Sequence, residues 1–333
     1  MGRLFLHIGT HKTGTTTVQR SLHAARTQLL ERGIVYPDYS AIGLPSHYAH
    51  LGVANALAGE HDAITLAQAE AFFAHVAVET AGGESDAILS AEPMWRQVLS
   101  STPPYAIEGV EEYWEARDRY IGKLAELVGD ATIVIVLRRQ AEFSQSMYQE
   151  HVKVTRYKEV FQSFLRDFWF HFDYLGQYRA WKRRFPNVMI VRYDDIAGPS
   201  IAKRFLNQIG LKPGRLKSVE ATNVGLSADA VVIKRLLNHS SRSKADIENL
   251  ARKIDREISN LGLESKRSFF SSWHAMARFQ LSLNDDNVAL AKLSGHERLF
   301  DDIAEGTATS FGDFLNPKVA DMIAAQLEAS LPS

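Results

Sequence analysis

A glycine- and threonine-rich segment near the start of the chain has the composition of an anion-binding loop. Residues 9–17 read Gly-Thr-His-Lys-Thr-Gly-Thr-Thr-Thr, and Gly9 and Gly14 have the spacing of a phosphate-binding P-loop. Backbone N–H groups of such a turn, with the amino terminus of a following helix, form a cradle for an anion. A nucleotide triphosphatase carries its phosphate-binding lysine directly after the second glycine, but Thr15 stands there. The cation of this loop is Lys12, which can meet the bridging oxygen of a leaving group.

Strands alternate with helices through the first two-thirds of the chain. An apolar strand is predicted at residues 3–8, directly before the loop, and a helix begins near Thr16. Further strands are predicted by β-branched and apolar runs at residues 87–90, 131–137 and 188–192. Helical periodicity lies between and after them, at residues 66–80, 110–128, 142–153, 161–184 and 201–209. This alternation predicts an α/β fold with a parallel sheet between helices.

The last third of the chain has a helical pattern only. We expect no strand after Asn223, and helices at residues 228–261, 271–283 and 319–331. The predicted organisation is therefore an α/β core over residues 1–222. Residues 223–333 are expected to form a helical extension that caps the same domain.

Composition excludes several classes of protein. The 333 residues contain 38 Lys and Arg against 39 Asp and Glu, and a formal charge of −1 argues against a broad nucleic-acid surface. The absence of Cys excludes disulfides, thiolate catalysis and Cys-ligated metal sites. No apolar run approaches the ~20 residues of a membrane span, and the opening residues lack a signal-peptide pattern. We expect a cytoplasmic protein with no nucleic-acid partner and no transmembrane segment.

The loop resembles the 5′-phosphosulfate loop of the sulfotransferases that use 3′-phosphoadenosine 5′-phosphosulfate (PAPS). In that family a strand leads into Pro-Lys-Thr-Gly-Thr-Thr or Pro-Lys-Ser-Gly-Thr-Thr, and residues 11–16 here read His-Lys-Thr-Gly-Thr-Thr. The resemblance implies a three-layer fold like that of P-loop NTPases. It also implies that the donor binds the loop residues, which are His11, Lys12, Thr13, Gly14, Thr15, Thr16 and Thr17.

A second match concerns the 3′-phosphate of the donor. In the family this phosphate is held by an Arg at the end of a later buried strand and by a Ser eight residues on. Here Arg138 follows the strand of residues 131–137, and Ser146 is eight residues further. A guanidinium fork and a hydroxyl can together hold a phosphate monoester. The resemblance therefore implies that Arg138 and Ser146 bind the 3′-phosphate.

Two shorter segments agree with this resemblance, which covers residues 3–225 in order. Residues 87–92 (A-I-L-S-A-E) are similar to a family strand that ends in Ser-Ser-Glu, and residues 191–196 (V-R-Y-D-D-I) to its R-Y-E-D-L segment. The implied reaction is metal-independent, in-line transfer of the sulfuryl group from PAPS to a hydroxyl or amine, leaving PAP. Lys12 would neutralise the leaving phosphate, and family analogy suggests a carbohydrate or glycolipid acceptor.

The general base has three candidates. Families of this type use His or Glu, because the base must lie within hydrogen-bond reach of the acceptor. His47 and His50 lie in the loop after the first helix, which often faces the acceptor, and Glu92 ends a strand at the same rim. We rank the two histidines above Glu92. The twelve histidines show no metal-binding spacing, so no metal is expected.

Two other functions compete with this interpretation. One is a nucleotide kinase or NTPase with a degenerate P-loop, against which Thr15 argues. The other is a non-catalytic module that binds PAP or a polysaccharide, which would keep Lys12 and Arg138 but lack a competent base.

Overall fold

The computed structural model describes residues 2–61, 63–83, 85–216, 219, 225–264, 266–303, 306, 308 and 310–330, with side chains as far as 325 in the last helix. The chain forms two compact units. Unit 1 comprises Met1–Arg138, Phe170–Thr222 and Asp285–Phe300, and unit 2 comprises Arg139–Trp169, Asn223–Asn284 and Asp301–Ser333. One change of unit therefore falls at the expected boundary after residue 222, but residues 139–169 group with the C-terminal part. The division into a core and an extension of one domain stays a prediction.

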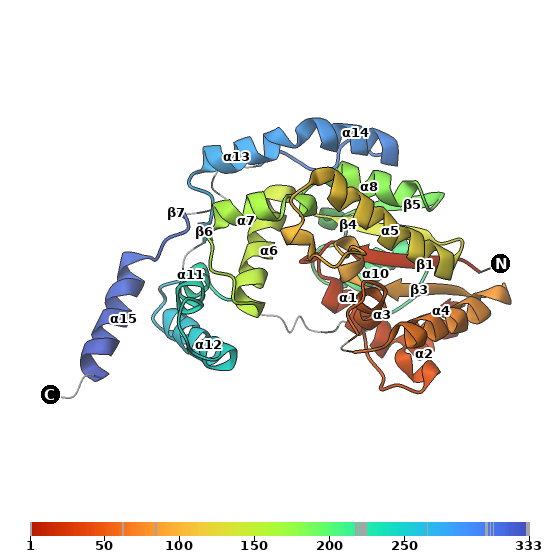
Figure 1. Ribbon diagram of the computed structural model, residues 1–333, viewed down its shortest axis with the longest axis horizontal. Coiled ribbons are helices and arrows are strands. Elements are labelled where there is room, and N and C mark those ends of the chain that lie inside the picture. The colour runs from red at the N-terminus through yellow and green to blue at the C-terminus, as the bar shows by residue number, and fades with distance from the viewer. Residues whose placement is uncertain are drawn as a thin grey trace. The chain divides into compact units, whose positions relative to one another are not determined.

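Unit 1 contains a five-stranded sheet in the order β2-β3-β1-β4-β5, in which all paired strands are parallel (Figure 1). The strands are β1 (Leu4–Gly9), β2 (Ile34–Val35), β3 (Asp86–Ser90), β4 (Thr132–Leu137) and β5 (Asn187–Arg192). The α/β prediction is confirmed, and four of the strands lie within a residue or so of their expected positions. Strand β2 was not predicted, because two residues are too few to show the alternating pattern of a strand.

Helices cover both faces of this sheet and complete three layers. Alternate strand residues such as Phe5 and Val134 pack against Leu22 and Phe205 of the first helical layer. That layer consists of α1 (Thr15–Ala24), α2 (Arg26–Leu30) and α10 (Ile201–Gln208). The opposite layer consists of α3 (Leu51–Leu57), α4 (Leu66–Ala81), α5 (Val110–Val128) and α8 (Tyr174–Lys182), which pack on one another. The remaining elements of unit 1 are α9 (Tyr193–Ile196), α14 (Asn284–Ser294), and 3-10 turns at Tyr39–Ile42, Glu92–Trp95 and Pro104–Ala106.

The predicted long helix at residues 161–184 is wrong. The segment instead contains α7 (Phe161–Asp167), a 3-10 turn (Trp169–His171) and α8. Asp173 starts α8 as its N-cap, and its side chain accepts a hydrogen bond of 2.7 Å from the Gly176 backbone N–H. The aromatic residues that suggested one continuous helix belong to two elements.

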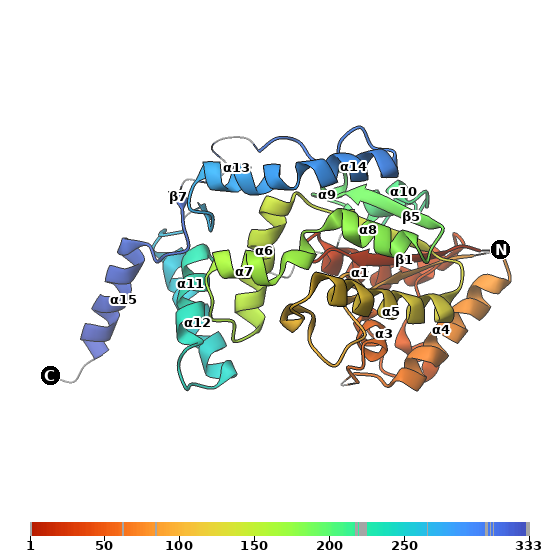
Figure 2. The same ribbon diagram turned by 45° about the horizontal axis from the view of Figure 1, so that its top comes forward.

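Unit 2 is mainly helical (Figure 2). Its helices are α6 (Gln140–Val154), α7, α11 (Ala228–Leu237), α12 (Lys244–Asn260), α13 (Trp273–Ser282) and α15 (Pro317–Ser330). The predicted helix of residues 228–261 is broken, since Ser243 caps a new helix by accepting from the Asp246 N–H. The expectation of no strand after Asn223 is also wrong: β6 (Arg267–Ser268) and β7 (Ser310–Phe311) pair in parallel. Among the described residues no helix combines the length and apolarity that a membrane crossing requires.

Candidate functional site

The predicted site residues of unit 1 gather at one edge of the sheet. The loop of residues 10–14 follows β1, Glu92 follows β3, Arg138 follows β4, and Tyr193 follows β5. All strands are parallel, so their carboxyl ends lie at the same edge, where open α/β sheets bind their ligands.

The loop after β1 has an unusual backbone conformation. Gly9 and Gly14 have φ values of 100° and 74°, and Lys12 has φ 61°. A lysine in the left-handed region costs on the order of 1 kcal/mol, and such residues concentrate at functional sites. The Thr10 N–H donates to the Val136 carbonyl oxygen at 2.9 Å, which fixes the loop to the neighbouring strand β4. The strand pair β1–β4 therefore positions the turn that carries Lys12.

The threonine hydroxyls of the loop fall into two groups. Those of the buried Thr13 and Thr15 donate to the Thr10 carbonyl oxygen, at 2.6 and 3.3 Å. Thr16 and Thr17 are half-buried, and their hydroxyls take no hydrogen bond from or to the part of the chain that the structure describes. Two of the predicted donor contacts therefore build the loop, whereas two are available to a ligand.

The amino terminus of α1 is open to an anion. Gly14 is the N-cap, no side chain caps the helix, and its first turn has no acidic residue. A Cβ at Gly14 would lie 2.3 Å from Cδ1 of Ile201, so the close packing of α10 requires glycine here. Free backbone N–H groups at a helix amino terminus, beside the Lys12 loop, attract a phosphate or sulfate group.

His11 is a neutral member of the loop. Its Nε2 accepts a hydrogen bond of 3.3 Å from Arg96 Nε, which places the ring proton on Nδ1. Burial, with the charges of Arg96 and Lys12, lowers the pKa of His11 to about 3. His11 therefore brings no positive charge to an anion, but it connects the loop to the segment after β3.

Glu92 lies directly against the loop. A Cβ placed on Gly9 would be 3.0 Å from Glu92 Cβ, and Gln19 of α1 donates from Nε2 to Glu92 Oε2 at 2.9 Å. The residue as a whole is half-buried. Burial raises the pKa of Glu92, and the hydrogen bond from Gln19 opposes this shift. A carboxylate with a raised pKa, held beside an anion loop, has the properties of a general base.

The two histidine candidates are placed differently. His50 has no exposed surface, and both ring nitrogens are engaged: Nε2 donates to the Pro37 carbonyl oxygen at 2.7 Å, and Nδ1 accepts from the Ser90 N–H at 2.9 Å. Burial lowers the pKa of His50 to about 4. His47 is exposed, stacks on Tyr48, and its Nδ1 is 2.8 Å from the Ala49 carbonyl oxygen. His50 thus fixes the loop of residues 37–50 to the end of β3.

Arg138 is oriented by two tyrosines. Its guanidinium lies over the ring of Tyr193, with Cζ 5.3 Å from the ring centroid, and its carbonyl oxygen accepts from the Tyr174 hydroxyl at 2.7 Å. The Tyr193 ring also lies 4.0 Å from a Cβ built on Gly14, so it stands beside the loop as well. Arg138 and the loop are therefore brought together within unit 1. Ser146 is half-buried on α6 of unit 2.

Arg117 is a residue of the site's framework that the sequence analysis missed. It is fully buried in α5 and donates to the carbonyl oxygens of Met94 and Gln97, at 2.6 Å each, and to Gln177 Oε1 at 3.0 Å. These bonds hold the segment that carries Glu92 and Arg96. An arginine in a helical pattern is typical of a surface position, so this role could not be predicted from the pattern. Tyr193 had a weak signal, because it lies in the segment of residues 191–196 that is similar to the R-Y-E-D-L segment.

Metal ligands are not gathered anywhere in the described ranges: no group of three or more His, Asp or Glu side chains is placed to hold an ion. The expected independence from metal stays a prediction.

Comparisons with known proteins find a weak structural similarity. No family model matches the chain. No curated protein matches its sequence. Two solved structures are similar to it: a sulfotransferase from Alicyclobacillus acidocaldarius, at 13% identity and a TM-score of 0.38, covers 74% of this chain and 98% of its own. A sulfotransferase domain from the curacin biosynthetic pathway, at 12% identity and a TM-score of 0.35, covers 78% of this chain and 97% of its own. At these identities and TM-scores the similarity says nothing about the activity of this chain.

Proposed function

We propose that this chain is a cytoplasmic sulfotransferase that takes PAPS as donor and transfers its sulfuryl group to a hydroxyl of a carbohydrate or glycolipid acceptor. The observation that carries the proposal is the juxtaposition of Lys12, the uncapped amino terminus of α1 and Arg138 at one sheet edge. The loop and helix terminus suit a phosphosulfate, and the Arg138 guanidinium suits a second phosphate. Thr15 in place of the P-loop lysine argues against ATP.

We infer that Glu92, rather than His47 or His50, is the general base. Glu92 touches the loop at Gly9, and its carboxylate has acceptor positions beyond the one that Gln19 uses, whereas both ring nitrogens of His50 are already bonded to backbone groups. In the proposed reaction Glu92 takes the proton of the acceptor hydroxyl as the oxygen–sulfur bond forms. Lys12 stabilises the charge that appears on the leaving phosphate oxygen as the donor's sulfur–oxygen bond breaks.

The donor site is tested by calorimetric titration with PAP, with ADP, and with ATP plus Mg²⁺. PAP should bind without metal and more tightly than ADP, which lacks the 3′-phosphate. Arg138→Ala should remove this preference, whereas Arg139→Ala is the matched control because Arg139 is paired with Glu142 at 2.5 Å. Binding of ATP with Mg²⁺ and no preference for PAP would favour the kinase function instead.

Lys12 is tested in the transfer reaction. With a panel of saccharide acceptors and release of PAP as the readout, Lys12→Ala should lower the rate by about 10²–10³-fold, as expected for one electrostatic stabiliser. Circular dichroism and thermal unfolding should change little, because Lys12 is only half-buried and lies outside the apolar core. A variant that retains wild-type turnover would remove Lys12 from the mechanism.

A further inference from the structure

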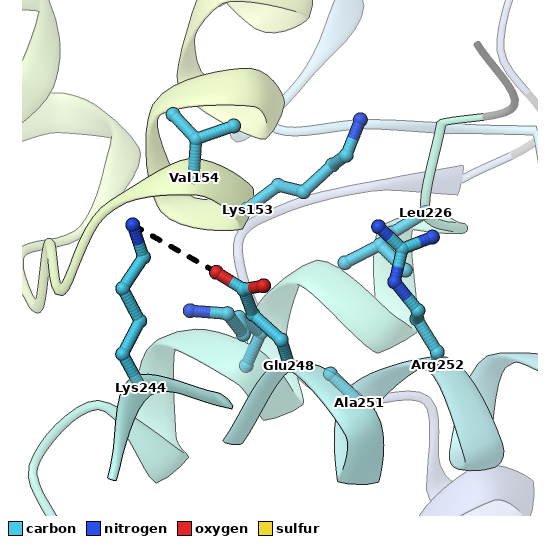
Figure 3. A pocket seen from close by; sticks show the side chains of 8 residues that line it. Lys153, Val154, Leu226, Lys244, Glu248, Ala251 and Arg252 are labelled. Atoms are coloured by element: carbon cyan, nitrogen blue, oxygen red, sulfur yellow. Dashed lines mark ion pairs between the residues drawn. The ribbon is translucent and has the colours of Figure 1, made fainter. Parts of the chain in front are cut away.

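Unit 2 contains a basic pocket that the proposed reaction does not use. Its volume is about 210 Å³, and Figure 3 shows its lining from close by. Four cationic side chains and one carboxylate surround it, with apolar side chains between them: Lys153, Val154, Leu226, Lys234, Lys244, Glu248, Ala251 and Arg252. The residues come from the end of α6, from α11 with the residues before it, and from α12.

The floor of the pocket holds a buried ammonium group. Lys234 is 1% exposed, and its Nζ donates to the Thr155 carbonyl oxygen at 3.1 Å and to Asn238 Oδ1 at 2.9 Å. Both acceptors are neutral, and no carboxylate of the described chain lies within ion-pair distance of this Nζ. Burial lowers the pKa of Lys234 and the charge of Glu248 only opposes this shift, so a bound anion would further stabilise the charged form of this lysine.

Three further cationic side chains, Lys153, Lys244 and Arg252, line the pocket. Arg252 is exposed and makes no ion pair with the described residues. Lys244 is the first residue of α12, where a helix dipole disfavours a cation, and it lies 3.9 Å from a carboxylate oxygen of Glu248. Lys153, which pairs with Glu150 at 3.2 Å, completes the rim. In Figure 3 Glu248 stands between Lys244 on one side and Lys153 and Arg252 on the other.

We propose that this pocket binds a small phosphate monoester. The lining holds four cations and Glu248, and Lys153 is also paired with Glu150, so an excess of about two positive charges remains, which suits a group that carries about two negative charges at neutral pH. A volume of about 210 Å³ is sufficient for a phosphate with a short carbon skeleton. The methyl groups of Val154, Leu226 and Ala251 offer contact to that skeleton. Glycerol 3-phosphate has this size and charge.

Binding is tested by calorimetry at low ionic strength with the whole chain, using glycerol 3-phosphate as probe and glycerol as the neutral control. Lys153→Gln and Arg252→Gln should each raise the Kd about threefold to tenfold, the scale of one partly exposed charge contact. Glu248→Gln should lower the Kd, because it removes the only negative charge of the lining. Lys253→Gln is the matched control, since Lys253 is exposed on the same helix but outside the pocket.

Several results would overturn the proposal. They are the absence of saturable binding at millimolar glycerol 3-phosphate, equal weakening in Lys253→Gln, and unchanged binding in Glu248→Gln. Displacement by saturating PAP would also overturn it, because the pocket would then be part of the donor site. Vesicles of phosphatidylcholine with and without phosphatidic acid form a second arm. Binding that requires phosphatidic acid and is lost in Arg252→Gln would support the pocket with a lipid headgroup as its source.

Discussion

His50 and Glu92 flank the same strand end but use their polar atoms in different ways. His50 bonds to the Ser90 backbone N–H through one ring nitrogen and to the Pro37 carbonyl oxygen through the other. Glu92 accepts a side-chain hydrogen bond from Gln19 and is half-buried. A carboxylate has about four acceptor positions, so Glu92 keeps capacity for an acceptor hydroxyl. His50 keeps none.

Burial shifts both pKa values, with opposite consequences for catalysis. It lowers the pKa of His50 to about 4, so His50 is neutral at neutral pH, but its lone pair is already taken by Ser90. It raises the pKa of Glu92 above the ordinary value, which makes the carboxylate a stronger base. A titratable side chain near a ligand loop is therefore a candidate base only if one of its lone pairs is uncommitted.

The largest expected effect separates these two residues directly. Glu92→Gln should lower kcat by about 10²–10⁴-fold, because the acceptor loses its proton acceptor while the amide keeps the shape of the side chain. PAP affinity should change little. His50→Gln should lower the free energy of unfolding, measured by urea denaturation, but leave kcat of the folded fraction within about tenfold of wild type. The opposite pattern, with rate lost only in His50→Gln, would make His50 the base.

A smaller effect tests what holds Glu92 in place. Arg117→Leu leaves the buried carbonyl oxygens of Met94 and Gln97 without their donor, so we expect a loss of about 3 kcal/mol in the free energy of unfolding. Urea denaturation measures it. Arg119→Leu is the control, because Arg119 lies on the same helix but is exposed. Equal stability in the two variants would mean that Arg117 does not hold this segment.

The sequence predicted the backbone of the site better than its chemistry. The loop, the strand before Arg138 and the position of Glu92 at a strand end follow from local periodicity and from the rule that parallel strands present their carboxyl ends at one edge. The hydrogen bonds of His50, which was ranked above Glu92, could not be predicted from the sequence. Pro37 and Ser90 approach the His50 ring only after the chain folds. The hydrogen bonds of Arg117 to Met94 and Gln97 could not be predicted for the same reason. Two-residue strands such as β2 are formed by pairing alone and leave no periodic signal.

The smallest effect concerns the pH dependence of the reaction. The hydrogen bond from Gln19 lowers the pKa of Glu92 against the raising effect of burial. Gln19→Leu removes this bond, so the pKa of Glu92 should rise further above its ordinary value. A general base acts in its ionised form, so the rate is lost as the pH falls through this pKa. The acidic limb of the profile of kcat against pH should therefore move to higher pH in Gln19→Leu, with little change on the alkaline side.

Gln97→Leu is the matched control for this shift. Gln97 is also buried in the segment after β3, but its amide donates to Asn55 Oδ1 at 2.9 Å instead of to Glu92. It should lower stability and leave the acidic limb where it is in the wild type. An acidic limb that moves equally in both variants would report general loosening of the segment. If the acidic limb moves in neither variant, a group other than Glu92 takes the proton. The difference between Glu92 and His50 would then have no bearing on catalysis.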